Sequence, residues 1–454
     1  MNKPAKNDSP LTDISASESL LRSQVEMILE TARELGATAA EVAVSQDLGL
    51  SVTARMGELE TVEFNQDRGF GITVYLDDCK GVASTSDVSR EAVVDVVKAA
   101  LNIARYTQPD PCNGLAASEL MASNLPDLDI YHPWQITVED ATSQALACEA
   151  EAMAFDKRIV NSDGATVASQ LSCLAYGNSH GFLESFLSSR HSLGLAVIAN
   201  DEGGMQKDYW YTVGRRPGDL ENGLLVGQEA ARRTVARLGS RGFDAGKLPV
   251  LFSAQMSAGL IGSLLGSLMG GALYRNASFL TDSMGSKVAR DDISIIEYPH
   301  LKCAMGSAGF DGDGVATSSK EFIKKGVVNS YILSAYSARR LGMQTTGNSG
   351  GVRNVRIEGE LSTFSQLLKQ MGSGVMITQL MGQGVNTVTG DYSRGASGFW
   401  VENGEIAFPI ENFTIASNLK DMFLGVAGIG NDVDLRGNVC CGSLLIGEMT
   451  IANG

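Results

Sequence analysis

The chain has 454 residues, of which 44% are hydrophobic and 19% are charged, and its formal net charge at pH 7 is −16. This length exceeds what one hydrophobic core usually supports, so we expect two or three domains, and the composition excludes disordered and collagen-like classes. The acidic charge argues against nucleic acid and against an anionic membrane surface as partners, because both attract basic patches.

The N-terminal segment 1–19 is polar and is expected to be a tail that precedes the first domain. It contains Lys3 and Lys6, and no apolar run follows it, so we predict neither a secretory signal nor a transit peptide. The seven cysteines are an odd number and are scattered, which fits free thiols in a reducing compartment. We therefore expect a cytoplasmic protein.

An N-terminal α+β domain is predicted over residues 20–110. Apolar residues from Leu21 to Leu35 recur on one helical face, and Gly36 ends the pattern. Between Glu41 and Tyr75 the period changes to two, which predicts an antiparallel meander. Ser89 is the expected N-cap of the helix that follows.

A central α+β region is predicted over residues 111–245, after a proline-rich connector between Pro109 and Pro133. A helix is expected from Glu139 to Asp156. The stretch from Ile159 to Val213 reads as strands of a second sheet, and a helix from Leu220 to Leu238 closes the region.

The C-terminal domain, 246–454, is glycine-rich and dominated by short strands. The predicted fold class is therefore α+β, and a barrel is one possible arrangement of the C-terminal strands. Its predicted helices span residues 254–274, 331–341, 364–371 and 419–424. The first of these is uncharged and long enough to cross a membrane, but glycines and serines dilute its hydrophobicity. We expect a buried helix whose Gly262, Gly266 and Gly270 permit close backbone approach.

Histidine and acidic residues give two weak indications of metal chemistry. No pair of the four histidines has the spacing of a helical zinc motif, although His180 and His191, with Cys173 nearby, could meet across a hairpin. Ordinary hydrogen-bonded histidines are the favoured interpretation. The segment Asp311-Gly-Asp-Gly-Val resembles part of a calcium loop but lacks its outer ligands, so we predict a plain turn.

Several motifs together resemble the TldD/PmbA family, and their order and spacing are similar to its PmbA/TldE type. They cover nearly the whole chain from about residue 20 onward: Val62-Glu-Phe-Asn, Gly177-Asn-Ser-His-Gly, Tyr274-Arg, Ser334-Ala-Tyr-Ser-Ala-Arg, Met381-Gly-Gln-Gly-Val and Thr389-Gly-Asp-Tyr-Ser-Arg-Gly-Ala-Ser-Gly-Phe-Trp.

The resemblance implies a cytosolic zinc-dependent peptidase in which a TldD-type subunit pairs with a TldE-type subunit and acts on unfolded or modified peptides. The TldD type carries a His-Glu-x-x-x-His helix that binds zinc. Alignment through Arg275 places Gly262, Ser263 and Ser267 at those positions of this chain. Glycine has no side chain and a serine hydroxyl is a weak zinc ligand and base. We therefore predict neither a catalytic residue nor a metal ligand here, with zinc in the partner.

The resulting hypothesis is a non-catalytic subunit of a metallopeptidase complex that helps to bind peptide. Arg275, Asp391, Tyr392 and Arg394 are the candidate contacts with peptide or partner, although structural roles for them are equally compatible with the sequence. Two alternatives stay open: a self-sufficient metallopeptidase that uses His180 and His191, and a regulatory protein-binding subunit. A homodimer of the isolated chain also stays open.

Overall fold

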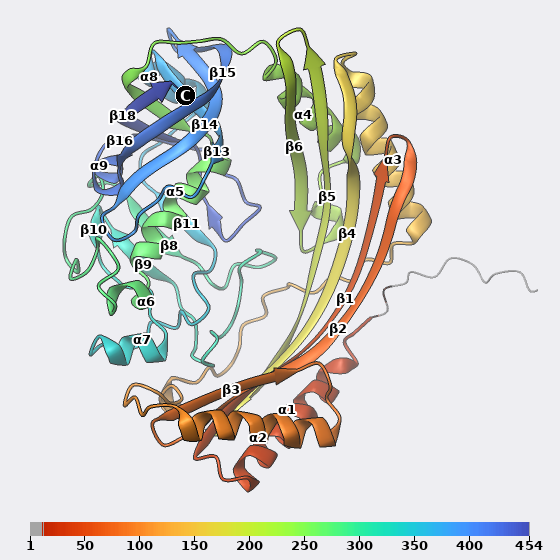
Figure 1. The fold of residues 1–454 in the computed structure, drawn as a ribbon, viewed down its shortest axis with the longest axis vertical. Coiled ribbons are helices and arrows are strands. Elements are labelled where there is room, and N and C mark those ends of the chain that lie inside the picture. The colour runs from red at the N-terminus through yellow and green to blue at the C-terminus, as the bar shows by residue number, and fades with distance from the viewer. Residues whose placement is uncertain (1–10, 12, 454) are drawn as a thin grey trace, which may run out of the picture.

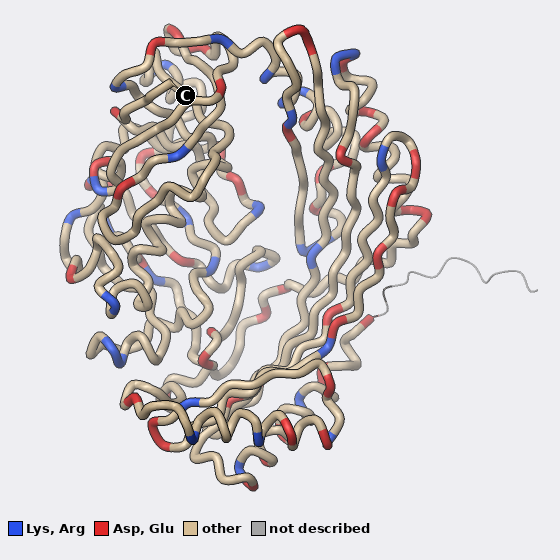
Figure 2. The backbone as a smooth tube through the Cα atoms, in the orientation of Figure 1, with Lys and Arg blue, Asp and Glu red and all other residues tan. Residues whose placement is uncertain are grey.

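A computed structural model describes residues 11 and 13–453 of the chain. A long curved sheet with helices on one side faces a second lobe, which is built from the C-terminal half of the chain (Figure 1). Acidic and basic positions are interspersed along both lobes (Figure 2). The predicted α+β class is confirmed.

The helices of the described part follow the sequence pattern closely in the first half of the chain. Their bounds are α1 Ser17–Glu34, α2 Arg90–Tyr106, α3 Val138–Phe155, α4 Gly223–Ala236, α5 Ala254–Ser267, α6 Gly270–Leu273, α7 Ala335–Arg340, α8 Phe364–Met371 and α9 Leu419–Leu424. Ser89 caps α2 as predicted, because its hydroxyl accepts from the Ala92 N–H.

The strands fall into three sheets. The first has the order β3-β2-β1-β4-β5-β6, the second β10-β9-β8-β11-β17, and the third β12-β16-β18-β15-β14-β13-β7. Their bounds are β1 Ala39–Arg55, β2 Glu58–Leu76, β3 Cys79–Thr85, β4 Ile159–Asn178, β5 Leu183–Asp201, β6 Gly204–Gly214, β7 Gly246–Phe252, β8 Ser294–Glu297, β9 Lys320–Lys324, β10 Val327–Val328, β11 Val355–Glu358, β12 Leu361–Ser362, β13 Gly374–Met381, β14 Asp391–Glu402, β15 Glu405–Asn418, β16 Val426–Gly430, β17 Val439–Cys440 and β18 Leu444–Asn453.

The first sheet joins the predicted N-terminal and central regions. β1 pairs with β4 in antiparallel register from Glu41↔Asn178 to Ala54↔Ala165. The prediction of a separate second sheet between Ile159 and Val213 is therefore wrong, because those strands extend the first sheet. The connector after residue 110 leads from the first three strands of this sheet to the other three.

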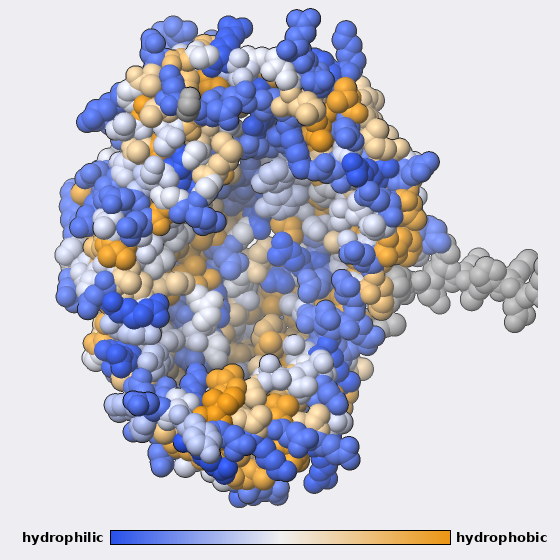
Figure 3. Space-filling model, viewed as in Figure 1, coloured by the Kyte–Doolittle hydropathy of each residue, from blue (hydrophilic) through white to orange (hydrophobic). Residues whose placement is uncertain are grey.

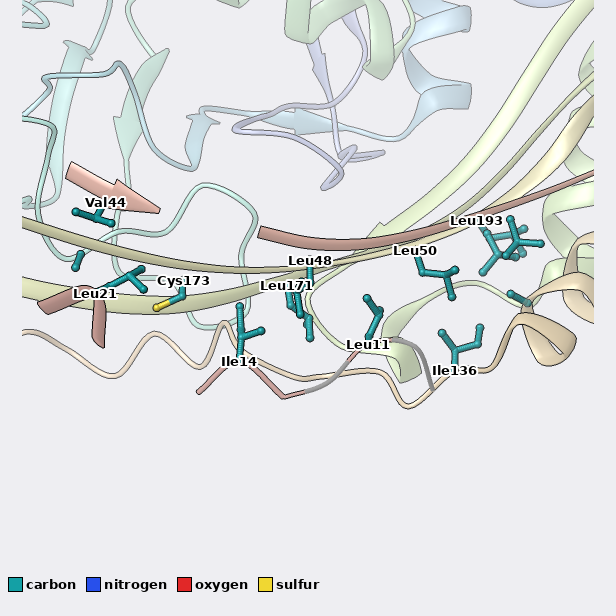
Figure 4. Packing of buried hydrophobic residues seen from close by; sticks show 14 of the residues in the cluster. Leu11, Ile14, Leu21, Val44, Leu48, Leu50, Ile136, Leu171, Cys173 and Leu193 are labelled. Atoms are coloured by element: carbon teal, nitrogen blue, oxygen red, sulfur yellow. The ribbon is translucent and has the colours of Figure 1, made fainter. Parts of the chain in front are cut away.

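One face of this sheet is apolar and is covered by α1 to α4, because alternate residues of each strand point toward the helices. Figure 4 shows part of that core, with Leu48 of β1 beside Leu171 of β4 and Leu50 further along β1. Leu11 and Ile14 also pack there, so the described end of the predicted polar tail contributes to the core. Residues 1–10 and 12 of that tail lie outside the described residues.

The third sheet closes on itself, because β18 pairs with β7 as well as with β15. Strands β7, β13, β14, β15 and β18 thus form a five-stranded barrel, which confirms the barrel-like expectation. The prediction of a single uncharged helix over 254–274 is wrong, because two helices lie there. Met269 is extended and forms a β-bridge with Ile332, and this extended residue separates α5 from α6. No helix in the described ranges is long and apolar enough to cross a membrane.

Candidate functional site

A hollow separates the open face of the curved sheet from the C-terminal lobe (Figure 3). Its sheet side carries small and polar residues, among them Ser45, Asp47, Ser51 and Thr53 of β1, which alternate with the buried residues of the same strand. A cavity of about 590 Å³ lies between β6 and the start of α5. The hollow therefore contains a recess that is lined by residues of both lobes.

Arg436 connects the two lobes beside that cavity. Its guanidinium forms a bidentate pair with Asp434, donates to the carbonyl oxygen of Tyr211 at 2.9 Å, and lies 4.1 Å from the ring centroid of Trp210. The paired carboxylate raises the pKa of Arg436, although burial opposes that shift. This contact holds the loop after β16 against β6 and so defines one wall of the hollow.

The helix α5 has an exposed face on which glycines leave the backbone without side chains. Its apolar residues Leu260, Ile261, Leu264 and Leu265 are buried, whereas Gly259 and Gly262 are exposed. No atom lies within 4 Å of the position that a Cβ would take at Gly259, Gly262 or Gly266. The expectation that Gly262 and Gly266 permit close approach inside this chain is therefore wrong, and of the three predicted glycines only Gly270 is closely packed, against Ser337.

The hydroxyl groups of α5 are engaged by the helix itself. Ser263 Oγ donates to the Gly259 carbonyl and Ser267 Oγ donates to the Ser263 carbonyl, both at 3.0 Å. Ser267 is fully buried, whereas Gly262 is exposed, because residues five apart on a regular α-helix point about 140° away from each other. Gly262, Ser263 and Ser267 therefore present no convergent set of ligands.

The four predicted contact residues lie in two places. Asp391 is exposed and accepts hydrogen bonds from Thr389 and Asn418, which hold its pKa below the usual range. Tyr392, on the same strand, is only 2% exposed and its ring packs beside Phe252.

Arg394 on β14 is half-buried, and its Nε has no partner within the described part. Arg275 is exposed and lies over the ring of Tyr274, as does Arg340. Within the described part of the chain, no hydrogen bond or ion pair joins Arg275 to the β14 residues. The burial of Tyr392 argues against direct contact with a peptide, whereas the other three remain accessible at least in part.

His180 and His191 do not form a metal site. His180 is exposed in the turn after β4, whereas His191 is fully buried on the helix side of the sheet, opposite Ser169. Because the turn lies about seven residues along the hairpin from that pair, the two imidazoles are roughly 20 Å or more apart. Burial lowers the pKa of His191, whose Nδ1 lies 2.9 Å from Ser169 Oγ and whose Nε2 lies 2.8 Å from the His132 carbonyl. The alternative of a self-sufficient peptidase that uses both histidines is wrong.

Two acids, the half-buried Glu41 and the buried Asp311, line a cavity of about 450 Å³ between β1 and the loop at 308–312, and Glu41 carried no signal in the sequence. Glu41 accepts hydrogen bonds from Tyr75 and Tyr176, and burial raises the pKa of its carboxyl. Asp311 accepts N–H groups from Asp313, Val315 and Ser349, yet burial raises its pKa to about 6. The predicted plain turn at Asp311 is confirmed, since its carboxylate binds backbone groups.

Comparisons with known proteins agree with this arrangement. Three models described as PmbA/TldA metallopeptidase match the chain: domain 1 over residues 40–104, the central domain over 131–238 and the C-terminal domain over 245–453. The chain is 46% identical over 442 residues to Metalloprotease PmbA of Escherichia coli O157:H7, which covers 97% of this chain and 98% of the relative. The chain belongs to the PmbA/TldD family. It is a member of the PmbA/TldE type, as the motifs predicted.

Solved structures of this family share the fold. A Bacteroides thetaiotaomicron protein labelled a candidate modulator of DNA gyrase superposes with a TM-score of 0.91 at 25% identity, and the match covers 97% of this chain and 100% of that one. TldE from Thermococcus kodakarensis superposes with a TM-score of 0.80 at 18% identity, again over 97% and 100%. The second likeness bears on the fold alone.

Membership of a metallopeptidase family raises the question of which residues would hold a metal on α5. The open face of the helix carries glycines, and the two serines next to it donate to backbone carbonyls. Neither residue type supplies the imidazole, thiolate or carboxylate that zinc requires. The side chains of α5 therefore do not fit a catalytic zinc.

Proposed function

We propose that this chain is the non-catalytic subunit of a cytoplasmic two-subunit peptidase. A TldD-type partner would hold the zinc and hydrolyse unfolded or modified peptides, while this chain would form part of the peptide channel and of the subunit interface. The observation that carries the proposal is the open face of α5, where Gly262 and Ser263 offer no metal ligand although relatives of the chain are named metalloproteases.

The shape of the hollow supports a role in peptide binding. Its sheet side presents small polar residues, and the start of α5 lines the cavity within it. Further along α5, Gly259 and Gly262 leave helix backbone that a second backbone can approach closely. Backbone pairing gives affinity without strong sequence preference, which suits unfolded peptides. Asp391, Arg394 and Arg275 remain the proposed polar contacts with peptide or partner, with Tyr392 supporting Asp391 and Arg394 from the core.

Cleavage of an unstructured peptide tests the proposal. We expect the isolated chain to be inactive, a TldD-type subunit alone to have little activity, and the mixture to cleave the peptide in a manner that a zinc chelator abolishes. Glycines on α5 allow a steric test: Gly262→Trp in this chain should lower cleavage by the mixture, whereas Gly242→Trp in the connector before β7 should not.

Two outcomes would contradict the proposal. Peptide cleavage by the isolated chain with added zinc would show that it is itself the enzyme. An inert mixture that nevertheless forms a stable complex would favour the regulatory alternative, in which this subunit binds a protein without serving peptide hydrolysis. Metal content alone does not decide between these outcomes, so the peptide assay is the deciding measurement.

A further inference from the structure

Asp129, His132 and Cys303 form a cluster where the two lobes meet. Each offers one possible ligand atom, and these atoms all lie within 4.8 Å of one another. His132 Nε2 is 3.1 Å from Asp129 Oδ1, and Cys303 Sγ is 3.4 Å from Asp129 Oδ2. Tetrahedral zinc, with bonds of about 2.0–2.3 Å, holds its ligand atoms roughly 3.3–3.8 Å apart. The three side chains therefore need to move only slightly to share a cation.

The backbone around the cluster is held in place from both lobes. The Cys303 N–H donates to the Leu128 carbonyl at 3.0 Å, which ties the loop at 301–305 to the connector before α3. The His132 N–H donates to Ser189 Oγ at 2.9 Å, and the His132 carbonyl oxygen lies 2.8 Å from Nε2 of the buried His191. The cluster thus has the positional support that a metal site needs.

Arg216 already places a positive charge in the cluster. Its guanidinium forms an ion pair with Asp129, and its Nε lies 3.3 Å from His132 Nε2. The Arg216 side chain is 44% exposed, so it can turn out to solvent. A divalent cation with one carboxylate and one thiolate is electrically neutral, whereas the same site with Arg216 in place carries one excess positive charge. Metal and Arg216 should therefore compete.

We propose that Asp129, His132 and Cys303 bind one zinc-like cation that joins the two lobes. A set of one thiolate, one imidazole and one carboxylate favours zinc or another late first-row metal over calcium or magnesium. On binding, the Cys303 thiol releases its proton to solvent, His132 coordinates through Nε2, Arg216 leaves, and a water molecule completes four ligands. This site is distinct from the zinc expected in a TldD-type partner and does not rest on the proposed peptidase role.

Metal titration of the full-length isolated chain tests the inference. After chelator treatment, we expect one equivalent of Zn²⁺ to bind and to raise the melting temperature. Co²⁺ in its place should give the near-ultraviolet absorption of a thiolate-bound cobalt ion. Cys303→Ser should weaken binding by about 100-fold or more and remove that absorption. Cys112→Ser, at a half-buried cysteine outside the cluster, should bind Zn²⁺ as the unmodified chain does.

Arg216→Ala provides the second, independent readout. Removing the competing guanidinium should tighten Zn²⁺ binding by about tenfold, whereas loss of an ordinary surface ion pair would leave metal affinity unchanged. The inference is overturned if Cys303→Ser binds metal as tightly as the unmodified chain, if cobalt shows no thiolate absorption, or if Arg216→Ala binds Zn²⁺ no more tightly. The melting temperature of each metal-free variant shows that it is folded.

Discussion

The buried ion pair between Glu297 and Lys320 gives the sharpest test of what holds the C-terminal lobe together. Glu297 is fully buried, and Lys320 Nζ lies 2.9 Å from its Oε2. Asn348 Nδ2 donates to both carboxylate oxygens, at 2.9 and 3.0 Å, and the Arg353 N–H donates to Oε1 at 2.6 Å. Both oxygens of the Glu297 carboxylate thus accept hydrogen bonds inside the lobe, and Lys320 supplies the positive charge that pairs with it.

Lys320→Met keeps the aliphatic stem and removes the charge. We expect the free energy of unfolding to fall by about 3–5 kcal/mol, because an uncompensated carboxylate is left out of water. In the double variant with Glu297→Gln, the buried charge is gone. We therefore expect the loss of unfolding free energy to be smaller by about 2 kcal/mol than in Lys320→Met alone. Urea unfolding at pH 7, followed by circular dichroism, measures both.

An exposed ion pair of the same lobe serves as the matched control. Lys247 lies 2.9 Å from Glu448, with side chains that are 70% and 61% exposed, so Lys247→Met should cost less than about 1 kcal/mol. The reasoning is refuted if Lys320→Met is as mild as Lys247→Met. It is also refuted if adding Glu297→Gln brings no recovery, because the penalty would then come from lost packing and not from an unpaired charge.

Three further tests probe stability elsewhere. Gly227→Ala should cost about 1–3 kcal/mol, because its Cβ would lie 2.3 Å from the Cys148 carbonyl where α3 meets α4. Gly262 has open space around it, so Gly262→Ala should be neutral or stabilising by up to about 1 kcal/mol. If Gly227→Ala and Gly262→Ala changed the free energy of unfolding in urea equally, close packing at Gly227 would not be the cause of its cost. Asp311 has a folded pKa of about 6 against an ordinary 3.8, so it contributes stability that is complete below pH 3.8 and is lost as the pH rises through 6, about 3 kcal/mol in all. Asp311→Asn should flatten the decline of the free energy of unfolding between pH 4 and pH 7. An unchanged slope would contradict the raised pKa of Asp311.

The local patterns of the sequence predicted the first half of the fold well, because amphipathic periodicity depends only on neighbouring residues. The buried stripe of α1, which includes Leu21 and Val25, is an example. The joining of β1 to β4 could not be predicted in the same way. Those strands are separated by more than a hundred residues, and their register depends on the helices that pack on them jointly.

The candidate site, too, could be predicted from the sequence only in part. The motif at 389–400 and the glycines of α5 were visible in the sequence, whereas their surroundings were not. His180 and His191 are close in sequence, yet the hairpin register puts one in the turn and the other in the core beside Ser169. His132 and Cys303 are far apart in sequence and carried no spacing signal, yet the fold brings them together.

The three glycines on the open face of α5 have no explanation among the described residues of this chain. Glycine costs a helix about 1 kcal/mol relative to alanine at each position, and neither a left-handed backbone nor a close neighbour requires it at Gly259, Gly262 or Gly266. The proposed function supplies a reason for this cost of about 3 kcal/mol, which is contact with a molecule outside this chain. A peptide or a partner that approaches the helix backbone would supply it, because any side chain on this face would keep the two backbones apart. If Gly262→Ala raises stability and also lowers peptide cleavage by the mixed subunits, the glycine face is maintained for binding at the expense of folding.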